Sequence, residues 1–172
     1  KIGIVGHTGR GNYGHHLDMA FVGVEGAEIM ALADPHEAGR TNALAKTGAL
    51  KGYANYLEML ERENLDIAVI ASREIGDHLE LVTNCLERGT NVYLEKPVAA
   101  SVAEVDQMIA ARDKAQLQVI VANPWRGHPP IQKVAIPSIK NGRIGIPRLC
   151  RIYGMGGEHG GNQLFLDLYP HF

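Results

Sequence analysis

Three residues able to do chemistry stand side by side where an apolar segment of the chain ends. Glu95, Lys96 and Pro97 directly follow the run Asn91–Leu94, which has the composition of a buried strand. In an open parallel sheet, ligands bind beyond the carboxyl ends of the strands, so a lysine there could donate a hydrogen bond to a substrate oxygen while Pro97 fixes the turn. From position alone, a surface ion pair in a loop explains the same residues equally well.

Glycines follow the first apolar run of the chain, Ile2–Val5, in a spacing that suits a dinucleotide. Gly6 closes that run. Gly9, Gly11 and Gly14 follow in the order G-x-G-x-x-G. Such glycines permit a tight turn and let backbone N–H groups approach a pyrophosphate at the start of the next helix, which we expect over Leu17–Phe21. The motif is weak alone and is strengthened by this context. The competing interpretation is that these are ordinary turn glycines.

Asp34 ends the second apolar run, 20 positions after Gly14. A carboxylate at this place in a dinucleotide-binding unit can accept hydrogen bonds from both ribose hydroxyls of the adenosine half, and it repels the extra 2′-phosphate of NADP. We therefore expect NAD as the cofactor. Arg40 is close enough in sequence to keep NADP open as the less favoured cofactor, and Asp34 could instead serve only as a helix cap.

The elements around these residues alternate between strand and helix, which is typical of a parallel sheet. The predicted strands are Ile2–Val5, Glu28–Ala33, Ile67–Ala71, Asn91–Leu94 and Leu117–Ala122, with a short extra strand at Gly52–Tyr53. They are continuous apolar runs, as expected where helices cover both faces of a sheet. The sequence thus predicts a doubly wound α/β domain, a dinucleotide-binding Rossmann domain, over residues 1–122.

Helix boundaries are clearest after Ser101, where Ser101 and Glu104 form a capping box. The apolar stripe expected on this helix is Val102, Val105, Met108 and Ile109. An earlier helix is predicted to stop at Gly89.

The organisation changes at Asn123. A helix is predicted over Ile131–Asn141 and a strand over Leu149–Tyr153, followed by a glycine-rich segment. We expect residues 123–172 to begin a second domain. Because the chain starts directly on a strand pattern and stops within an apolar segment, we expect it to be incomplete at both ends.

The composition, 172 residues with 45% hydrophobic and 21% charged, is that of a globular protein with a core. A net charge of −2 with scattered Lys and Arg offers no basic face for nucleic acid, and no apolar run is long enough to span a membrane. Cys85 and Cys150 lack zinc or redox spacing, which favours buried reduced thiols and a cytoplasmic location. The histidines lack ligand-spaced partners, so no metal is expected.

Several segments together resemble the Gfo/Idh/MocA family of NAD(P)-dependent oxidoreductases. They are the glycine loop after "IGIV", then "ALADP", "EKP" and "GGNQLFLDLYPHF", and the resemblance covers nearly the whole chain. It implies a Rossmann domain followed by an α+β domain with a mostly antiparallel sheet that often mediates oligomerisation, so a homo-oligomer is expected. It also implies hydride transfer between a nicotinamide and a hydroxyl or carbonyl group of a sugar, polyol or related small molecule.

The resemblance assigns roles to residues of this chain. Lys96 corresponds to the lysine that contacts substrate and cofactor, and Asp167 with His171 to a D-x-x-x-H pair whose histidine takes the hydroxyl proton. The residues expected to bind substrate are Lys96, Asn123, Arg126 and His171. Those expected to bind the cofactor are Gly6, Gly9, Arg10, Gly11, Asn12, Tyr13, Asp34, Ser72, Arg73, His78, Glu95, Lys96 and Pro97.

Two other functions remain open from the sequence. A glycosidase of the same resemblance would use tightly held NAD to oxidise the sugar transiently, and net NADH production would distinguish a dehydrogenase from it. A nucleotide sensor would bind the cofactor without turnover, and the segment Ser72–Glu74, which departs from the pattern of the resemblance, slightly favours it. Fold does not fix function, so the dehydrogenase interpretation depends on the lysine, aspartate and histidine.

Overall fold

A computed structural model of the chain describes residues 1–123 and 128–148. The chain separates after Ala122 into two units, residues 1–122 and residues 123 onward. Several predictions fall outside the described residues: the strand Leu149–Tyr153 and the side chains of Arg126, Cys150, Asp167 and His171.

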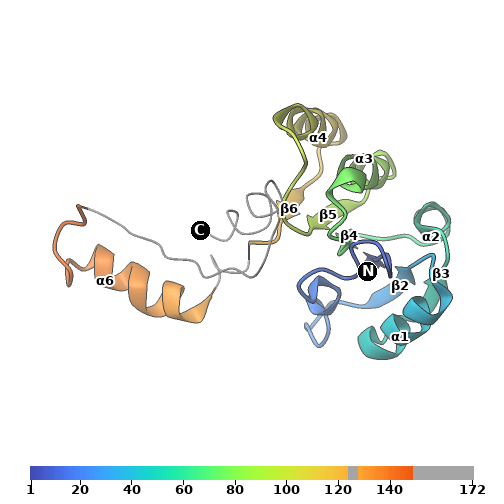
Figure 1. Ribbon diagram of the computed structural model, residues 1–172, viewed down its shortest axis with the longest axis horizontal. Coiled ribbons are helices and arrows are strands. Elements are labelled where there is room, and N and C mark those ends of the chain that lie inside the picture. The colour runs from blue at the N-terminus through green and yellow to red at the C-terminus, as the bar shows by residue number, and fades with distance from the viewer. Residues whose placement is uncertain (124–127, 149–172) are drawn as a thin grey trace. The chain divides into compact units, whose positions relative to one another are not determined.

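Within residues 1–122, a sheet of six parallel strands forms the centre (Figure 1). The strands are β1 (Ile2–Val5), β2 (Ile29–Ala33), β3 (Lys51–Tyr53), β4 (Ile67–Ile70), β5 (Asn91–Leu94) and β6 (Val119–Val121). Their order is β3-β2-β1-β4-β5-β6, so the chain crosses from one half of the sheet to the other between β3 and β4. This is the Rossmann-like, doubly wound α/β fold that the sequence predicts. Three of the predicted strands are longer than the observed ones, by one residue for β2 and β4 and by three residues for β6.

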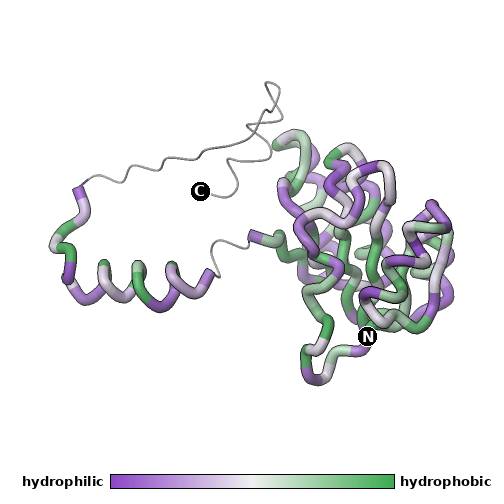
Figure 2. The backbone as a smooth tube through the Cα atoms, turned by 60° about the horizontal axis from the view of Figure 1, so that its bottom comes forward, coloured by the Kyte–Doolittle hydropathy of each residue, from purple (hydrophilic) through white to green (hydrophobic). Residues whose placement is uncertain are grey.

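Helices cover both faces of this sheet, which explains why its strands are apolar without alternation. They are α1 (Glu37–Thr47), α2 (Tyr56–Arg62), α3 (His78–Glu87) and α4 (Val102–Ala115). Figure 1 shows α1 on one side of the sheet and the other three helices on the opposite side. A buried cluster around Ile4 and Leu32 packs under α1, and a second around Met59 and Val82 packs under α2 to α4. Figure 2 accordingly shows hydrophobic segments running through the middle of this unit.

Helix α4 begins at a cap that differs by one residue from the predicted capping box. The Ser101 hydroxyl accepts a hydrogen bond from the Glu104 backbone N–H at 3.3 Å, as predicted. The Glu104 carboxylate, however, accepts from the backbone N–H of Ala100 at 3.0 Å and not from that of Ser101. The reciprocal bond thus secures the residue before the cap.

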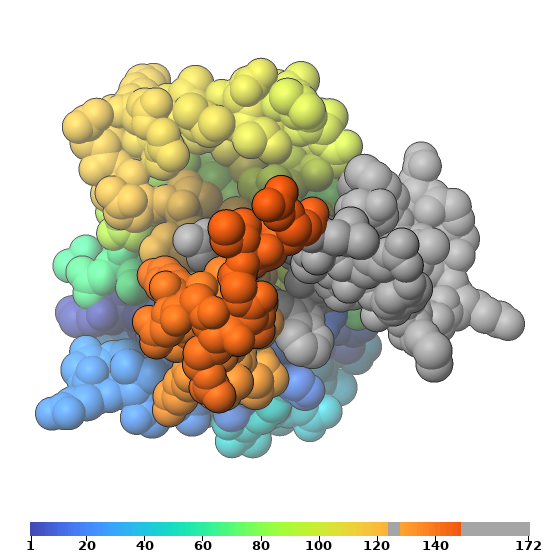
Figure 3. Space-filling view, turned by 90° about the vertical axis from the view of Figure 1, so that its left-hand side faces the viewer, coloured from blue at the N-terminus to red at the C-terminus, as the bar shows by residue number. Residues whose placement is uncertain are grey.

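The apolar stripe predicted for α4 is only half right. Val105 and Met108 pack on the core, but Val102 and Ile109 are 77% and 42% exposed. The two exposed residues are seven positions apart, so they share a line along the helix that is rotated away from the sheet. Both residues are exposed on α4, which forms the layer at the top of Figure 3.

The α-helix predicted over Leu17–Phe21 is wrong. The structure has a three-residue 3₁₀ helix, η1 (Leu17–Met19), which His16 precedes in the left-handed conformation. Gly23 and Gly26 have φ values of 75° and 80°, so the backbone turns where an α-helix would have to continue. Within residues 6–28, therefore, the glycine loop does not lead into an α-helix whose dipole could attract an anion.

Cys85, on α3, confirms the expectation of a buried thiol at that position. Its side chain is fully buried and free of a disulfide. Burial raises the pKa of this thiol to about 12, against a smaller opposite effect of Arg88. A protonated thiol in the core fills space and is a poor nucleophile.

In the second unit, the described residues 128–148 contain the helix predicted over Ile131–Asn141. A π-helical segment, η3 (Ile131–Ala135), continues directly into α6 (Ile136–Lys140). Pro137 lies in the first turn of α6. Because proline lacks a backbone N–H and its ring crowds the carbonyl four residues earlier, a widened turn before it accommodates the ring. Among the described residues, no helix is long and apolar enough to cross a membrane.

Candidate cofactor and active site

Loops that follow β1, β2, β4 and β5 meet at the carboxyl edge of the sheet. The direction of winding reverses between β1 and β4, and at such a switch point the flanking loops diverge and leave a crevice for a ligand. The glycine loop (residues 6–14) comes from β1, Asp34 from β2, the segment 72–77 from β4, and Glu95 with Lys96 from β5. Neighbouring loops thus bring most of the predicted cofactor residues to one edge.

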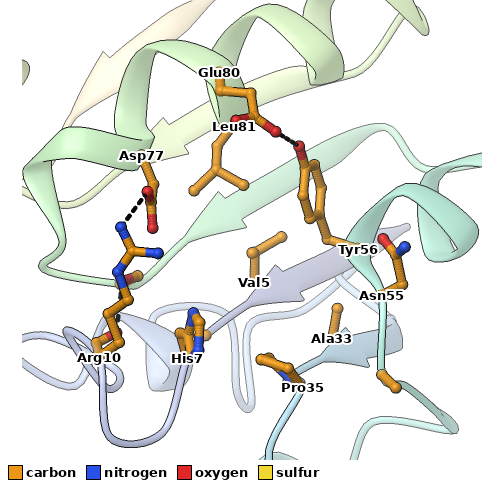
Figure 4. A pocket seen from close by; sticks show the side chains of 13 residues that line it. Val5, His7, Arg10, Ala33, Pro35, Asn55, Tyr56, Asp77, Glu80 and Leu81 are labelled. Atoms are coloured by element: carbon orange, nitrogen blue, oxygen red, sulfur yellow. Dashed lines mark hydrogen bonds and ion pairs between the residues drawn. The ribbon is translucent and has the colours of Figure 1, made fainter.

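A cavity of about 330 Å³ opens between the loops from the first half of this edge and helix α3 (Figure 4). Arg10 and Asp77 point toward each other there, with 2.8 Å between Nη2 and Oδ1, and the Tyr56 hydroxyl donates to Glu80 Oε1 at 2.8 Å. Apolar walls with a few polar groups are typical of a small-molecule site. The lining residues are Val5, Gly6, His7, Arg10, Ala33, Pro35, Ala54, Asn55, Tyr56, Ser72, Asp77, Glu80 and Leu81.

The tip of the glycine loop packs against the segment after β4. The Gly11 carbonyl accepts a hydrogen bond from the Arg73 backbone N–H at 3.1 Å, and the Ser72 hydroxyl donates to the Arg10 carbonyl at 3.3 Å. Gly11 has a φ of 75°, and a Cβ on it would collide with the Ser72 hydroxyl. Glycine is therefore required at this position both by the turn and by the close approach of the two loops.

Asp34 is fully buried, and donors of the protein itself surround its carboxylate. The hydroxyls of Thr8 and Tyr13 donate to Oδ2 at 2.6 and 2.7 Å. The backbone N–H of His36 donates to Oδ1 at 2.9 Å, and that of Thr8 lies 3.2 and 3.1 Å from the two oxygens. The helix-cap interpretation of Asp34 is wrong, because His36 caps α1 by accepting from the Gly39 N–H.

Hydrogen bonds decide the charge of Asp34. Burial alone would raise the pKa of this carboxyl, but the bonds from Thr8, Tyr13 and His36 together hold the pKa below its usual value. The carboxylate is consequently ionised at neutral pH.

The lowered pKa of Asp34 predicts how stability depends on pH. A carboxyl whose pKa is lower in the folded than in the unfolded chain stabilises the fold at neutral pH, and this contribution is lost as pH falls through the folded pKa. We expect the free energy of unfolding to decrease below about pH 4, where carboxyls of unfolded chains begin to bind protons. Chemical denaturation across this range should show a smaller decrease for Asp34→Asn than for the wild type. Equal decreases in the two proteins would contradict the assignment to Asp34.

Glu95 and Lys96 follow β5 as predicted, but neither lies on the surface. Glu95 is 2% and Lys96 is 1% exposed, so the interpretation as a surface ion pair is wrong. Glu95 Oε1 lies 2.8 Å from His15 Nδ1, and a Cβ on Gly14 would lie 2.6 Å from Glu95 Oε2. The Lys96–Pro97 peptide bond is cis. Because burying a lysine costs free energy, Lys96 is a candidate functional residue on physical grounds.

His78, predicted to contact the cofactor, lies buried at the start of α3. One ring nitrogen is 3.0 Å from the carbonyl oxygen of Pro97, and the other is 2.9 Å from that of Ser72. Neither nitrogen is left for a ligand in this arrangement. In this structure His78 connects the loop after β4 to the loop after β5, and its contact with the cofactor stays a prediction.

The structure also brings to the site residues that sequence reasoning missed. Thr8 covers the Asp34 carboxylate. The others line the cavity: Asn55, Tyr56, Asp77 and Glu80. A signal existed for Asn55 and Tyr56, because they follow the short strand β3, whose carboxyl end lies at the same edge of the sheet. The remaining three could not be recognised without the packing of the loops.

Other predicted site residues are not brought together by the described part of the chain. Asn123 is exposed after β6, and Arg126, Asp167 and His171 lie outside the described residues. In residues 1–123 and 128–148, no group of three or more His, Cys, Asp or Glu side chains could hold a metal ion.

Comparisons with known proteins agree with this geometry. A model of the oxidoreductase family with an NAD-binding Rossmann fold (Gfo/Idh/MocA) matches residues 1–123. Myo-inositol 2-dehydrogenase of Thermotoga maritima is 30% identical over 152 residues, which are 88% of this chain and 44% of the relative. A glycosyl hydrolase family 109 protein of Shewanella woodyi is 31% identical over 125 residues, 67% of this chain and 26% of the relative.

A solved structure gives the same result for the fold. Myo-inositol 2-dehydrogenase from Lactobacillus plantarum matches with a TM-score of 0.72 and 25% identity, over 84% of this chain and 42% of that protein. The chain spans less than half the length of these relatives. Its matched region contains the glycine loop, Asp34 and the EKP turn. The chain therefore belongs to the Gfo/Idh/MocA oxidoreductase family, with an NAD-binding Rossmann fold.

Proposed function

We propose that this protein is a nicotinamide-dependent oxidoreductase that transfers a hydride between the cofactor and a hydroxyl or carbonyl group of a polyol or sugar. What carries the proposal is the buried Lys96 at the end of β5, on the same sheet edge as the glycine loop and the cavity. A buried lysine at a ligand-binding edge is suited to an oxygen that gains negative charge during reaction. The two myo-inositol 2-dehydrogenases among the relatives support a polyol as substrate.

The cavity suits the adenosine half of the cofactor. Pro35 and Leu81 offer apolar surface to an adenine ring, while Arg10 supplies a positive charge beside the glycine loop. Asp34, adjacent to Pro35, would accept a ribose hydroxyl. The diphosphate would then pass the glycine loop, on the path from Asp34 toward Lys96.

We further propose NAD in preference to NADP. The ionised Asp34 would repel a phosphate on the adenosine ribose. Arg40, whose place in the sequence kept NADP open, donates from Nη1 to the backbone carbonyl of Asp34 at 2.7 Å. This bond gives Arg40 a structural role within the protein.

In the proposed reaction, the nicotinamide supplies the hydride acceptor. Lys96 donates a hydrogen bond to the alcohol oxygen and stabilises the negative charge that develops there as the C–H bond breaks. His171 accepts the hydroxyl proton and Asp167 orients its imidazole, as the family resemblance implies. A carbonyl product results, and the reverse reaction would use the same groups.

Assays with NAD and a panel of polyols and sugars test the proposal. We expect NADH to form with at least one cyclic polyol, myo-inositol being the first to try, and to see much less reduction of NADP. Tight binding of NAD without turnover of any member of the panel would contradict a dehydrogenase and favour a nucleotide sensor.

A glycosidase is the second candidate, and it is favoured by the 31% identity to the glycosyl hydrolase family 109 protein. Such an enzyme would return the hydride to the sugar in each turnover. NAD-dependent release of nitrophenol from an aryl glycoside, without net NADH, would establish this activity over the dehydrogenase.

We also propose that residues 123–172 begin a second domain with a mostly antiparallel sheet that contributes substrate and subunit contacts. The separation after Ala122 supports it, and so does the match to the Thermotoga maritima relative, which extends beyond the region of the family model. Sedimentation analysis should then detect a homo-oligomer of the protein.

A further inference from the structure

The carboxylate of Asp34, proposed to bind the cofactor ribose, has its acceptor positions filled by the protein itself. A carboxylate offers about four lone-pair sites. They face four donors, the backbone N–H groups of Thr8 and His36 and the hydroxyls of Thr8 and Tyr13. The side chain is also fully buried. A ribose hydroxyl can therefore reach Asp34 only if one of these donors leaves.

Three of the four donors are held in place by the fold. The Thr8 N–H lies three residues beyond the end of β1, and the His36 N–H belongs to the cap of α1. The Thr8 hydroxyl packs so closely against Gly39 that a Cβ on that glycine would overlap it. The His36 N–H could leave only if the start of α1 moved, and both donors of Thr8 are confined because its side chain packs against Gly39 of α1.

Tyr13 is the donor that can leave with the least disturbance. It lies between Asn12 and Gly14, whose φ values are 51° and 54°, in a loop without α-helix or strand structure. Its ring lies over Gly6 and is only partly buried. Burial and the hydrogen bond to Asp34 raise the pKa of its phenol, so the hydroxyl keeps its proton and stays a donor at neutral pH.

We propose that Tyr13 is a displaceable internal ligand of Asp34: its hydroxyl occupies the position that a ribose hydroxyl of the cofactor takes on binding. This inference rests on the proposed function. The group that replaces Tyr13 must itself donate a hydrogen bond to an anion. A ribose hydroxyl of NAD does so, whereas the 2′-phosphate of NADP brings acceptors and negative charge. Displacement of Tyr13 thereby contributes to the selection of NAD.

The variant Tyr13→Phe isolates this effect, because it keeps the ring over Gly6 and removes only the competing hydroxyl. We expect it to bind NAD about tenfold more tightly than the wild type in calorimetric titrations, since NAD no longer displaces a hydrogen bond to a charged group. Nicotinamide mononucleotide, which lacks the adenosine ribose, should bind both proteins equally. The matched control is Tyr53→Phe, which removes a tyrosine hydroxyl bonded to Glu63 beside β3 and should leave NAD affinity unchanged.

The outcomes separate the inference from the function on which it rests. If the wild type binds NAD and Tyr13→Phe binds it equally or more weakly, Tyr13 stays on Asp34 in the complex, and the inference is wrong while the function stands. If neither protein binds NAD, both fail. NMR of the wild type with labelled tyrosine rings gives a second test that does not depend on the variant. Saturating NAD should shift the Tyr13 signals and not those of Tyr53, and unchanged Tyr13 signals would overturn the inference.

Discussion

Replacing Lys96 with methionine should reduce kcat for polyol oxidation by about 10²- to 10³-fold, the effect of removing one donor that stabilises a developing oxyanion. Lys96 is buried at the end of β5, at the sheet edge where the substrate oxygen is proposed to lie. Methionine has a similar volume, so the core should still pack, but it offers neither charge nor hydrogen-bond donors. Because the adenosine half is proposed to bind beside β1 and β2, the affinity for NAD should change far less than kcat.

The control for this variant is Lys114→Met, which removes a lysine from the exposed end of α4 and should leave kcat unchanged. Thermal unfolding and NAD titration of all three proteins would verify that each is folded and binds the cofactor. The removal of an oxyanion donor should leave about a hundredth of wild-type kcat or less. If Lys96→Met keeps more than about a tenth of wild-type kcat, Lys96 does not have the role assigned to it.

Replacing Gly14 with alanine should lower the free energy of unfolding by about 2–5 kcal/mol. Gly14 has a φ of 54°, where an L-residue is strained by roughly 1–2 kcal/mol. A Cβ would also lie 2.6 Å from Glu95 Oε2 and 2.8 Å from the Ala71 carbonyl oxygen, and overpacking of this kind costs roughly 1–3 kcal/mol. The same change would push the glycine loop away from the EKP turn, so NAD binding should weaken as well.

Gly23 supplies the matched control. It also has a φ of 75°, but apart from its chain neighbours no atom lies within 4 Å of the place that an alanine methyl group would take. Alanine there adds backbone strain without a collision. Chemical denaturation of Gly14→Ala and Gly23→Ala measures the difference. Equal losses of stability would mean that Gly14 does not approach Glu95 as closely as the structure shows.

Much of the fold could be predicted because it depends on local patterns. The run Ile67–Ala71 is apolar on both faces, so it was recognisable as an interior strand to within one residue. Ser101 marks a helix start and Gly89, with a φ of 76°, a helix end, through chemistry confined to one turn. The position of Lys96 at the sheet edge followed directly from the strand before it.

The details of the site could not be predicted, because they depend on contacts between distant segments. Asp34 could be placed at the edge of the sheet, but the hydroxyls that cover it belong to Tyr13 and Thr8, 21 and 26 residues away. His78 resembled a ligand residue at a helix start, whereas its burial depends on the turn at Pro97, 19 residues later. The sequence pattern indicates which side chains stand near the edge of the sheet. It does not indicate which of these side chains contact one another.

The central claim is that the loops after β1, β2 and β5 form a nicotinamide cofactor site. Separate calorimetric titrations of NAD and NADP into the protein test this claim most directly, because they measure cofactor binding itself. We predict saturable binding of NAD with clearly weaker binding of NADP, as the ionised Asp34 requires. Binding of neither cofactor by a demonstrably folded sample would contradict the claim.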